Sequence, residues 1–307
     1  MPVEIPKDAH SCTVKCGKKN VTLTSLQTVF WPDLGKTKRD LLAYYSRIAP
    51  VLLPHLRNRA VVLKRYPDGI AGEFVLMKRV PPYKPYWLDA CPIEQRSGSV
   101  LDFPVIEDEA SLLWIVNLGC IDLNPWYGRC DRTDHPDYLH FELEPVPPAG
   151  FSQVRQVALR MKSYLDKRGA PSFPKTTGSR GMHISVPIYR KPVPKEVLEA
   201  AKRIAIELAK RHSDEITTEP RISRRPPGRV LIDYTQNAWG RTLASAYSVR
   251  PLPQATVSAP LRWGEVKAGV AAENFTMDSM PARIKKVGDL AAPLLKKRPR
   301  CPLESLA

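Results

Sequence analysis

The stretch Leu-His-Phe-Glu-Leu-Glu-Pro, residues 139–145, alternates apolar and polar side chains. A period of two is typical of a β-strand, whose successive side chains point to opposite faces. The leucines and the phenylalanine would share the core face, and His140, Glu142 and Glu144 would share the other. Residues i and i+2 of a strand lie roughly 7 Å apart at the backbone, and the oxygens of their carboxylates can converge on one divalent cation or on two neighbouring ones. By itself, however, the stretch favours a half-exposed strand whose polar face meets water.

A second stretch, residues 175–186, places hydroxyl, glycine and basic residues directly before an apolar strand. Glycine lets a backbone approach an anion closely, and successive amides can surround it. Lys175 and Arg180 would add charge, and the arginine fork suits phosphate oxygens. The stretch lacks the GxxxxGK[ST] pattern and leads into a strand. Alone it is more typical of a basic surface turn, and a single strand histidine such as His183 is more often structural than catalytic.

A third stretch, residues 229–237, ends a nearly all-apolar run at Asp233. Burying a carboxylate without a partner is costly, and a cation shared with Glu142 and Glu144 would supply one. An aspartate that caps the following turn is an equally good interpretation. Taken together, the three stretches contain the parts needed for metal-assisted nucleotidyl transfer: acids for metal ions, and cations for a triphosphate.

Composition narrows the class of partner. The 307 residues carry 47 Lys and Arg against 31 Asp and Glu, a formal charge of +16, which favours a polyanion such as nucleic acid. The 43% hydrophobic content excludes wholesale disorder. We find no secretory signal and no membrane-spanning run, so we expect a cytoplasmic protein with no membrane partner. Six cysteines are too few for a disulfide scaffold, so we expect a reducing compartment and regard Cys120 and Cys130 as ordinary small residues.

Helices and strands interleave along the chain, which predicts an α/β or α+β fold. Helical spacing and end signals predict helices from Thr37, over about 107–118, over 152–167 and from Pro194. Short β-branched or aromatic runs predict strands at 60–64, 74–78, 139–144, 183–188 and 229–234. We expect an N-terminal arm over 1–20, one functional unit over 21–290 and a basic flexible tail over 291–307.

The chain resembles the polymerase (primase-like) domain of bacterial ATP-dependent DNA ligase D, of the archaeo-eukaryotic primase superfamily. The resemblance runs from about residue 23 to residue 290. Its segments are Val-Phe-Trp-Pro (29–32), Lys-Arg-Tyr-Pro-Asp-Gly-Ile (64–70), Gly-Cys-Ile-Asp-Leu-Asn-Pro-Trp (119–126), Ile-Asp-Tyr-Thr-Gln-Asn (232–237), Ala-Tyr-Ser-Val-Arg (246–250) and Pro-Leu-Arg-Trp (260–263). So many ordered matches are more specific than any single motif.

The resemblance implies an α+β fold: an RRM-like primase-polymerase core with an antiparallel or mixed sheet flanked by helices, plus an N-terminal extension. It implies template-dependent addition of nucleotides, preferably ribonucleotides, at broken DNA ends in non-homologous end joining. Mn²⁺ or Mg²⁺ would be the cofactor and NTP or dNTP the substrate. The partners would be DNA with 5′-phosphate ends or gaps, Ku and a separate ATP-dependent DNA ligase, at the bacterial nucleoid.

The same resemblance assigns roles to individual residues. The catalytic and metal-binding acids would be Glu142, Glu144 and Asp233. The nucleotide-binding residues would be Lys175, Thr177, Ser179, Arg180, His183, Gln236, Asn237, Arg250 and Lys64. The DNA-binding residues would be Lys38, Lys36 and Arg65, with Lys38 in the pocket for a 5′ phosphate. Phe74, Tyr83, Tyr86 and Trp87 could stack on a template base, or could be partly buried in the core.

Three changes, at four positions, depart from the family pattern. Glu142 and Glu144 replace a pair of aspartates, Asn124 replaces a histidine, and Thr28 replaces a lysine. Each glutamate is one methylene longer than aspartate, and a displacement of about 1 Å can cost roughly 100-fold in rate. These changes keep an alternative open, in which the chain is a catalytically weakened homologue that binds DNA ends as a scaffold. A primase that starts chains without a primer is a third possibility.

Overall fold

In the computed structural model, which describes residues 2–95 and 97–306, the chain divides into two compact units. Unit 1 comprises residues 2–131, Ala244–Val257 and Phe275–Gly288, and unit 2 comprises Arg132–Leu243, Ser258–Asn274 and residues 289–306. That residues 21–290 act as one functional unit stays a prediction. No helix among the described residues is both long and apolar enough to cross a membrane.

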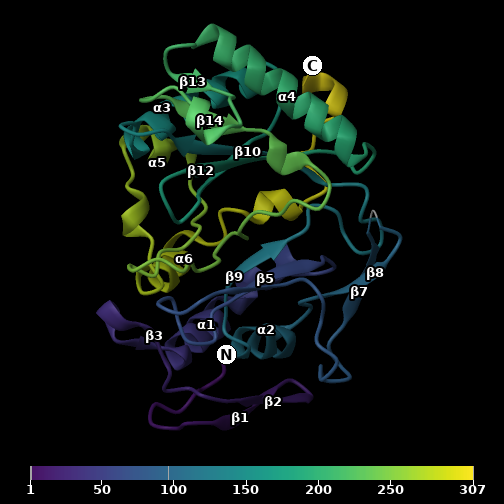
Figure 1. Cartoon of the computed structure of the whole chain (residues 1–307), viewed down its shortest axis with the longest axis vertical. Coiled ribbons are helices and arrows are strands. Elements are labelled where there is room, and N and C mark those ends of the chain that lie inside the picture. Colours follow the sequence, from purple (N-terminus) through teal and green to yellow (C-terminus); the bar gives the residue numbers. More distant parts are fainter. Residues whose placement is uncertain (1, 96, 307) are drawn as a thin grey trace. The chain divides into compact units, whose positions relative to one another are not determined.

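Unit 2 is built on a five-stranded sheet of order β11-β12-β10-β14-β13 (Figure 1). Its strands are β10 (Tyr138–Pro145), β11 (Phe173–Thr176), β12 (Met182–Pro187), β13 (Ile216–Thr217) and β14 (Val230–Asp233). Only the β13–β14 pair is parallel, which makes the sheet mixed. The helices are α3 (Phe151–Asp166), α4 (Pro194–Arg211) and α5 (Trp263–Ala268), with short 3-10 turns at Ile222–Arg224, Thr235–Asn237, Ala272–Asn274, Ala292–Leu295 and Leu303–Leu306.

The period of two in β10 sets the two faces of this sheet. Leu139, Phe141 and Leu143 are fully buried, and α3 and α4 pack against β10. The apolar stripes of both helices are buried as well, so the helices and this face of the sheet form one hydrophobic core. The opposite face of β10 is left for the polar side chains, which include Glu142 and Glu144.

Unit 1 contains a three-stranded sheet of order β6-β5-β9 and three hairpins. Its strands are β1 (Cys12–Cys16), β2 (Lys19–Leu23), β3 (Val29–Trp31), β4 (Lys36–Thr37), β5 (Val61–Arg65), β6 (Val75–Met77), β7 (Ala90–Glu94), β8 (Val100–Pro104) and β9 (Cys120–Pro125). The helices are α1 (Lys38–Leu56), α2 (Glu109–Asn117) and α6 (Ser279–Val287), with a 3-10 turn at Pro32–Leu34. Helix α1 begins where the sequence predicts, because the backbone N–H of Thr37 donates to Asp40 at 2.9 Å.

Both ends of the chain are more ordered than expected. The predicted N-terminal arm contains strand β1, and Val14 and Cys16 are buried. At the other end, Arg300 donates to the carbonyl oxygens of Asp137 and Ile188, each at 2.9 Å. Cys301 is also buried in unit 2. The structure therefore anchors the segment expected to be a flexible basic tail, because a single arginine satisfies several backbone carbonyls.

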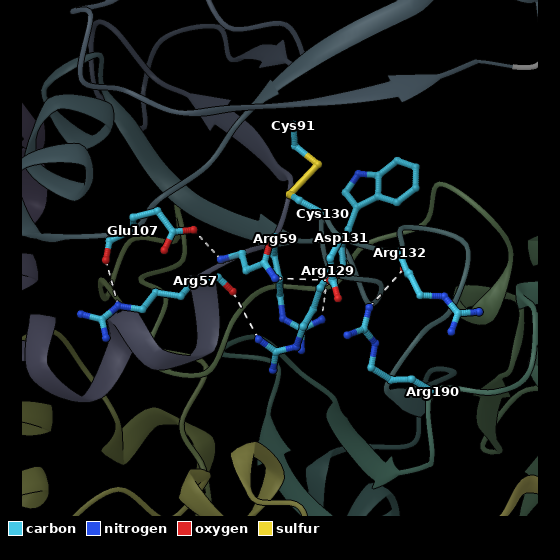
Figure 2. The surroundings of a disulfide bond; sticks show 11 residues. Arg57, Arg59, Cys91, Glu107, Arg129, Cys130, Asp131, Arg132 and Arg190 are labelled. Carbon is cyan, nitrogen blue, oxygen red and sulfur yellow. Dashed lines mark hydrogen bonds between the residues drawn. A yellow bond between two sulfur atoms is a disulfide. The ribbon is translucent and has the colours of Figure 1, made fainter.

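A disulfide joins Cys91 in β7 to Cys130 (Figure 2). The view of Cys130 as an ordinary small residue is therefore wrong, since spacing alone could not reveal that the two Cα atoms lie 5.7 Å apart. The backbone N–H of Cys130 also donates to the carbonyl of Asn58 at 2.8 Å. The bond thus ties the β7–β8 hairpin to the last residues of the first segment of unit 1.

Removing this disulfide is expected to lower the free energy of unfolding by about 2–4 kcal/mol, because a loop of 39 residues regains entropy in the unfolded chain. Urea denaturation of the double variant Cys91→Ser/Cys130→Ser, compared with the oxidised protein, measures the loss. Cys12→Ser, at a half-exposed free cysteine, is the control. Equal midpoints for the double variant and the oxidised protein would contradict the prediction.

Candidate active site

The polar face of the unit 2 sheet carries a row of side chains across four strands. Glu142 of β10 pairs in register with His183 of β12 on one side and with Asp233 of β14 on the other. His183 pairs in turn with Lys175 of β11. Residues directly opposite one another in a sheet point to the same face, so Lys175, His183, Glu142 and Asp233 form one continuous row. Glu144 lies on the same face, two residues along β10 from Glu142.

Hydrogen bonds connect three members of this row. Lys175 Nζ lies 2.6 Å from His183 Nδ1, and His183 Nε2 lies 3.2 Å from Glu142 Oε1. A lysine ammonium can only donate, so Nδ1 is the acceptor and Nε2 carries the proton that is donated to Glu142. Lys175 also donates to Ser258 Oγ at 2.6 Å. His183 is buried, and its contacts fix the orientation of the Glu142 carboxylate.

Asp233 is held from the other side by the turn that follows it. Its Oδ1 accepts from the backbone N–H of Thr235 at 2.8 Å and from the hydroxyl of Thr235 at 2.6 Å. Its Oδ2 accepts from Gln236 Nε2 at 3.0 Å. The turn-capping interpretation of Asp233 is thus confirmed. It coexists with the placement of Asp233 opposite Glu142.

Glu144 has a different partner, Arg225, whose Nη1 lies 3.4 Å from Glu144 Oε2. Burial raises the pKa of Glu144, and the charges of Glu142 and Asp233 raise it further, whereas Arg225 and Arg180 lower it. Glu142 and Asp233 therefore oppose the ionisation of Glu144, and a bound cation would relieve this repulsion. The sequence analysis missed Arg225, although it belongs to a basic run, 221–225, ahead of β14.

The predicted phosphate loop bends tightly between β11 and β12. Thr177 Oγ1 accepts from the backbone N–H of Ser179 at 3.0 Å and of Gly181 at 3.2 Å. Gly178 has a φ of +73°, a conformation that favours glycine. A Cβ at Gly181 would lie 2.2 Å from the carbonyl oxygen of Leu143, so only glycine fits against β10 there. Thr177 shapes the loop, while the side chains of Ser179 and Arg180 are exposed.

The side chain of Asn237 forms hydrogen bonds with backbone groups of β10 and of the turn after β14. Its Oδ1 accepts from the backbone N–H of His140 at 2.9 Å. Its Nδ2 donates to the carbonyls of His140 at 2.7 Å and Tyr234 at 2.8 Å. Both amide hydrogens are used, so Asn237 links the turn after β14 to β10, and its contact with a nucleotide stays a prediction. No feature of the sequence distinguishes this use of an asparagine from ligand contact.

The remaining predicted residues belong to unit 1. Lys64 Nζ lies 3.5 Å and Arg250 Nη2 3.6 Å from Asp122 Oδ2. Lys36 pairs with Asp278 at 2.7 Å, and Arg65 Nε donates to the carbonyl of Leu118 at 2.8 Å. Lys38 is buried. Burial lowers its pKa to about 8, with a smaller contribution from Arg65.

Among the predicted aromatic residues, Phe74, Tyr83 and Tyr86 are 56%, 64% and 94% exposed. The alternative that they belong to the core is therefore wrong for these three side chains. Trp87 is half-buried, and Lys19 Nζ lies 5.1 Å from the centre of its ring. An exposed aromatic ring can stack on an unpaired base.

A cavity of about 630 Å³ opens on unit 2 away from these acids, lined by residues of α3 and α4. Two of its cations already have acidic partners: Arg160 pairs with Glu215 at 3.0 Å, and Arg211 pairs with Glu207. Its volume alone does not make it the reactive site, because a single carboxylate, that of Glu215, lines it. The face that carries Glu142 and Glu144 remains the better candidate.

Several known proteins are similar to this chain. Residues 37–291 match the LigD primase-polymerase domain. The chain is 29% identical over 278 residues to the multifunctional non-homologous end joining protein LigD of Mycolicibacterium smegmatis, covering 90% of this chain and 36% of that protein. It is 30% identical over 265 residues to the bifunctional LigD of Bacillus subtilis, covering 86% and 42%. The chain thus spans well under half the length of these relatives.

A solved structure is similar over nearly the whole chain. It is the polymerase domain from Mycobacterium tuberculosis ligase D in complex with DNA, with a TM-score of 0.85 and 28% sequence identity. The match covers 91% of this chain and 99% of that one. The expected α+β fold of the primase-polymerase type is therefore confirmed.

Proposed function

The chain belongs to the LigD primase-polymerase domain family, and on this basis we propose that it is a nucleotidyltransferase that extends broken DNA ends in non-homologous end joining. The observation that carries the proposal is the cross-strand row of Lys175, His183, Glu142 and Asp233, with Glu144 beside it. It supplies adjacent carboxylates and, next to them, a loop that presents Arg180. Nucleotidyl transfer requires both.

The carboxylates of Glu142, Glu144 and Asp233 fit Mn²⁺ or Mg²⁺ chemically, because hard divalent cations prefer carboxylate oxygens and because burial and the charges of Glu142 and Asp233 raise the pKa of Glu144. A bound cation would neutralise phosphate charge and polarise the attacking 3′ hydroxyl. The protein's own contribution is orientation. His183 fixes Glu142, and Thr235 and Gln236 fix Asp233, while Arg225 contacts one oxygen of Glu144.

For the NTP or dNTP substrate, we propose that Ser179, Arg180 and the loop amides of unit 2 bind the triphosphate. Within unit 1, we propose Lys64 and Arg250 as nucleotide-binding residues that contact phosphate. Ser179 and Arg180 are exposed, so they are accessible to a ligand. Lys175 lies behind His183 and supports it, so its contribution to binding is through His183. We propose that Gln236, which donates a hydrogen bond to Asp233, also lines the nucleotide site.

One observation favours the alternative of a DNA-end-binding scaffold. Within residues 2–95 and 97–306, no group of three or more His, Cys, Asp and Glu side chains is close enough together to hold a metal ion. The longer glutamates and Arg225 would then keep the site from closing on a cation. In that case the basic surface would still bind DNA, with an affinity that falls steeply as salt rises.

Primer extension separates the two functions. The substrate is a gapped duplex with a 5′ phosphate, supplied with ribonucleotides or deoxyribonucleotides and with Mn²⁺ or Mg²⁺. Extension supports the polymerase, and tight DNA binding without extension under either ion supports the scaffold. The same assay measures the preference for sugar and metal, and an unprimed template tests for priming.

We also propose that Lys38 recognises the 5′ phosphate and that this recognition weakens with pH. Burial lowers the pKa of Lys38 to about 8, so its charge is lost as the pH rises through that value, whereas an ordinary lysine stays charged to about pH 10. The charge of a phosphate monoester is constant above its second pKa of about 6. The preference for a 5′-phosphorylated gap over a 5′-hydroxyl gap should therefore fall about tenfold between pH 7 and pH 9.

Binding titrations at several pH values measure this preference. Lys38→Met should abolish it at every pH, and Lys38→Arg, which stays charged, should flatten the profile. A wild-type preference that is constant from pH 7 to pH 9 would count against Lys38 as the phosphate ligand.

The names of the relatives support a role in end joining, and we propose Ku and a separate ATP-dependent DNA ligase as protein partners. We propose that they act together at the nucleoid, in the cytoplasm. Co-purification with Ku on DNA that carries a double-strand end tests this. Loss of the complex after nuclease treatment would show that DNA alone bridges the two proteins.

A further inference from the structure

Asp122 in β9 is a buried carboxylate with an unusual environment. Its side chain is 0% exposed, and neither oxygen has a hydrogen-bond partner in the described part of the chain. Burying a charged carboxylate without hydrogen bonds is costly, and most buried polar groups avoid it. Asp122 is not among the residues predicted from the sequence. The free-energy cost of burying the Asp122 carboxylate would be explained if this residue had a functional role.

Two cations flank this carboxylate. Lys64 lies directly opposite Asp122 in the β5–β9 ladder, and its Nζ is 3.5 Å from Asp122 Oδ2. Arg250 approaches the same oxygen with Nη2 at 3.6 Å. Both distances exceed the usual hydrogen-bond range, so charge attraction holds the three groups without locking them together. The side chains of Lys64 and Arg250 are 34% and 20% exposed, so a ligand can reach both.

Arg250 has a fixed backbone and an unused donor. The backbone N–H of Arg250 donates to the carbonyl of Thr256 at 2.7 Å, and its backbone carbonyl accepts from the N–H of Leu252 at 2.8 Å. Its buried Nε, in contrast, has no acceptor among the described residues. The fixed backbone sets where the Arg250 side chain begins, and the exposed part of its guanidinium can donate to oxygen acceptors that arrive with a ligand.

We propose that Asp122 is a positioning residue, which holds Lys64 and Arg250 side by side so that both can bind the phosphate oxygens of a ligand. Two adjacent cations repel each other, and the carboxylate beneath them offsets this repulsion before the ligand arrives. The inference rests on the proposed function, because the phosphate would belong either to the incoming nucleotide or to the DNA backbone. Asp122 itself is buried and touches neither.

A purely structural role predicts the opposite sign. If Asp122 only neutralised excess charge, its removal would leave a more positive surface and phosphate binding would tighten. If Asp122 positions the two cations, its removal would let them move apart and phosphate binding would weaken. The direction of the change therefore decides between the two roles.

The test compares wild type, Asp122→Asn and Asp102→Asn. The second variant removes the same charge from an exposed side chain in β8 of the same unit. Calorimetric titration uses ATP with Ca²⁺ in one arm and a gapped duplex without nucleotide in the other. We expect Asp122→Asn to weaken binding about tenfold in one arm, which identifies the source of the phosphate, and Asp102→Asn to change neither beyond a small salt effect. Unchanged or tighter binding in both arms would overturn the proposal.

Coupling is measured by adding Lys64→Met and Arg250→Met singly and together with Asp122→Asn. The losses should be non-additive, because once Asp122 is gone the cations no longer act as a pair. A thermal melt of each variant shows whether it folds. If Asp122→Asn does not fold, acetylation of Lys64 in the wild type by acetic anhydride decides instead. Protection of Lys64 by one of the two phosphate ligands supports the proposal, and no protection by either overturns it.

These readouts are separate from catalysis. Should the wild type bind ATP in a manner that depends on Asp122 yet never extend a primer, the polymerase proposal fails and the role of Asp122 stands. Should it extend primers while Asp122→Asn binds both ligands normally, the reverse holds.

Discussion

Replacing Glu142 with glutamine is expected to reduce primer extension at least about 1,000-fold, with little change in DNA affinity. Glu142 is central in the row, because it lies between His183 and Asp233 in the register of β10. Glutamine has nearly the same shape and can still accept the hydrogen bond from His183, but it lacks the negative charge that a divalent cation requires. A loss of primer extension would therefore result from the missing charge and not from misfolding.

Single-turnover extension on the gapped duplex measures this loss, and a thermal melt confirms that the variant is folded. Glu199→Gln, on the exposed surface of α4, is the matched control and should be fully active. Extension by Glu142→Gln within tenfold of wild type would show that the reaction does not depend on this acid. The polymerase assignment would then lose its main support.

Gly181→Ala is expected to have the second-largest effect, a loss of about 100-fold in kcat/KM for the nucleotide. The added Cβ would lie 2.2 Å from the carbonyl oxygen of Leu143, so the loop or β10 must shift. The shift would move the loop that Thr177 closes and, with it, the neighbouring Glu144. Overpacking of this kind also costs about 1–3 kcal/mol of stability.

Gly264→Ala provides the control, because it lies in α5 of the same unit and a Cβ there meets nothing within 4 Å. It should leave activity unchanged. Urea denaturation and steady-state kinetics of both variants separate the stability loss from the catalytic loss. Normal kinetics for Gly181→Ala would mean that the loop tolerates displacement and does not place the triphosphate.

The sequence predicts the elements of the site better than their partners. The period of two in residues 139–145 gives the strand and its two faces, and the structure confirms that the leucines and Phe141 are buried. It cannot give the pairing of Glu142 with Asp233, because strand register depends on contacts between distant segments. It likewise could not show that Arg225 would reach Glu144 from more than 80 residues away.

Three other features escaped prediction for a related reason. The sequence does not distinguish Asp122 from an exposed polar residue, because its burial depends on the fold. It also does not show that the amide of Asn237 donates to the backbone carbonyl of His140. The Cys91–Cys130 bond joins residues that only folding brings together. In each case the residue type was visible, but its neighbours were not.

The way β10 is paired on both sides makes this strand intolerant of slippage. A shift of one residue against β12 and β14 would turn Glu142 and Glu144 towards α3 and α4 and bring Leu143 out into water. Such a chain would bury two charges in its hydrophobic layer, a state far too costly to persist. The two acids thus help to specify the register of β10. A folded molecule has its carboxylates on the face opposite α3 and α4.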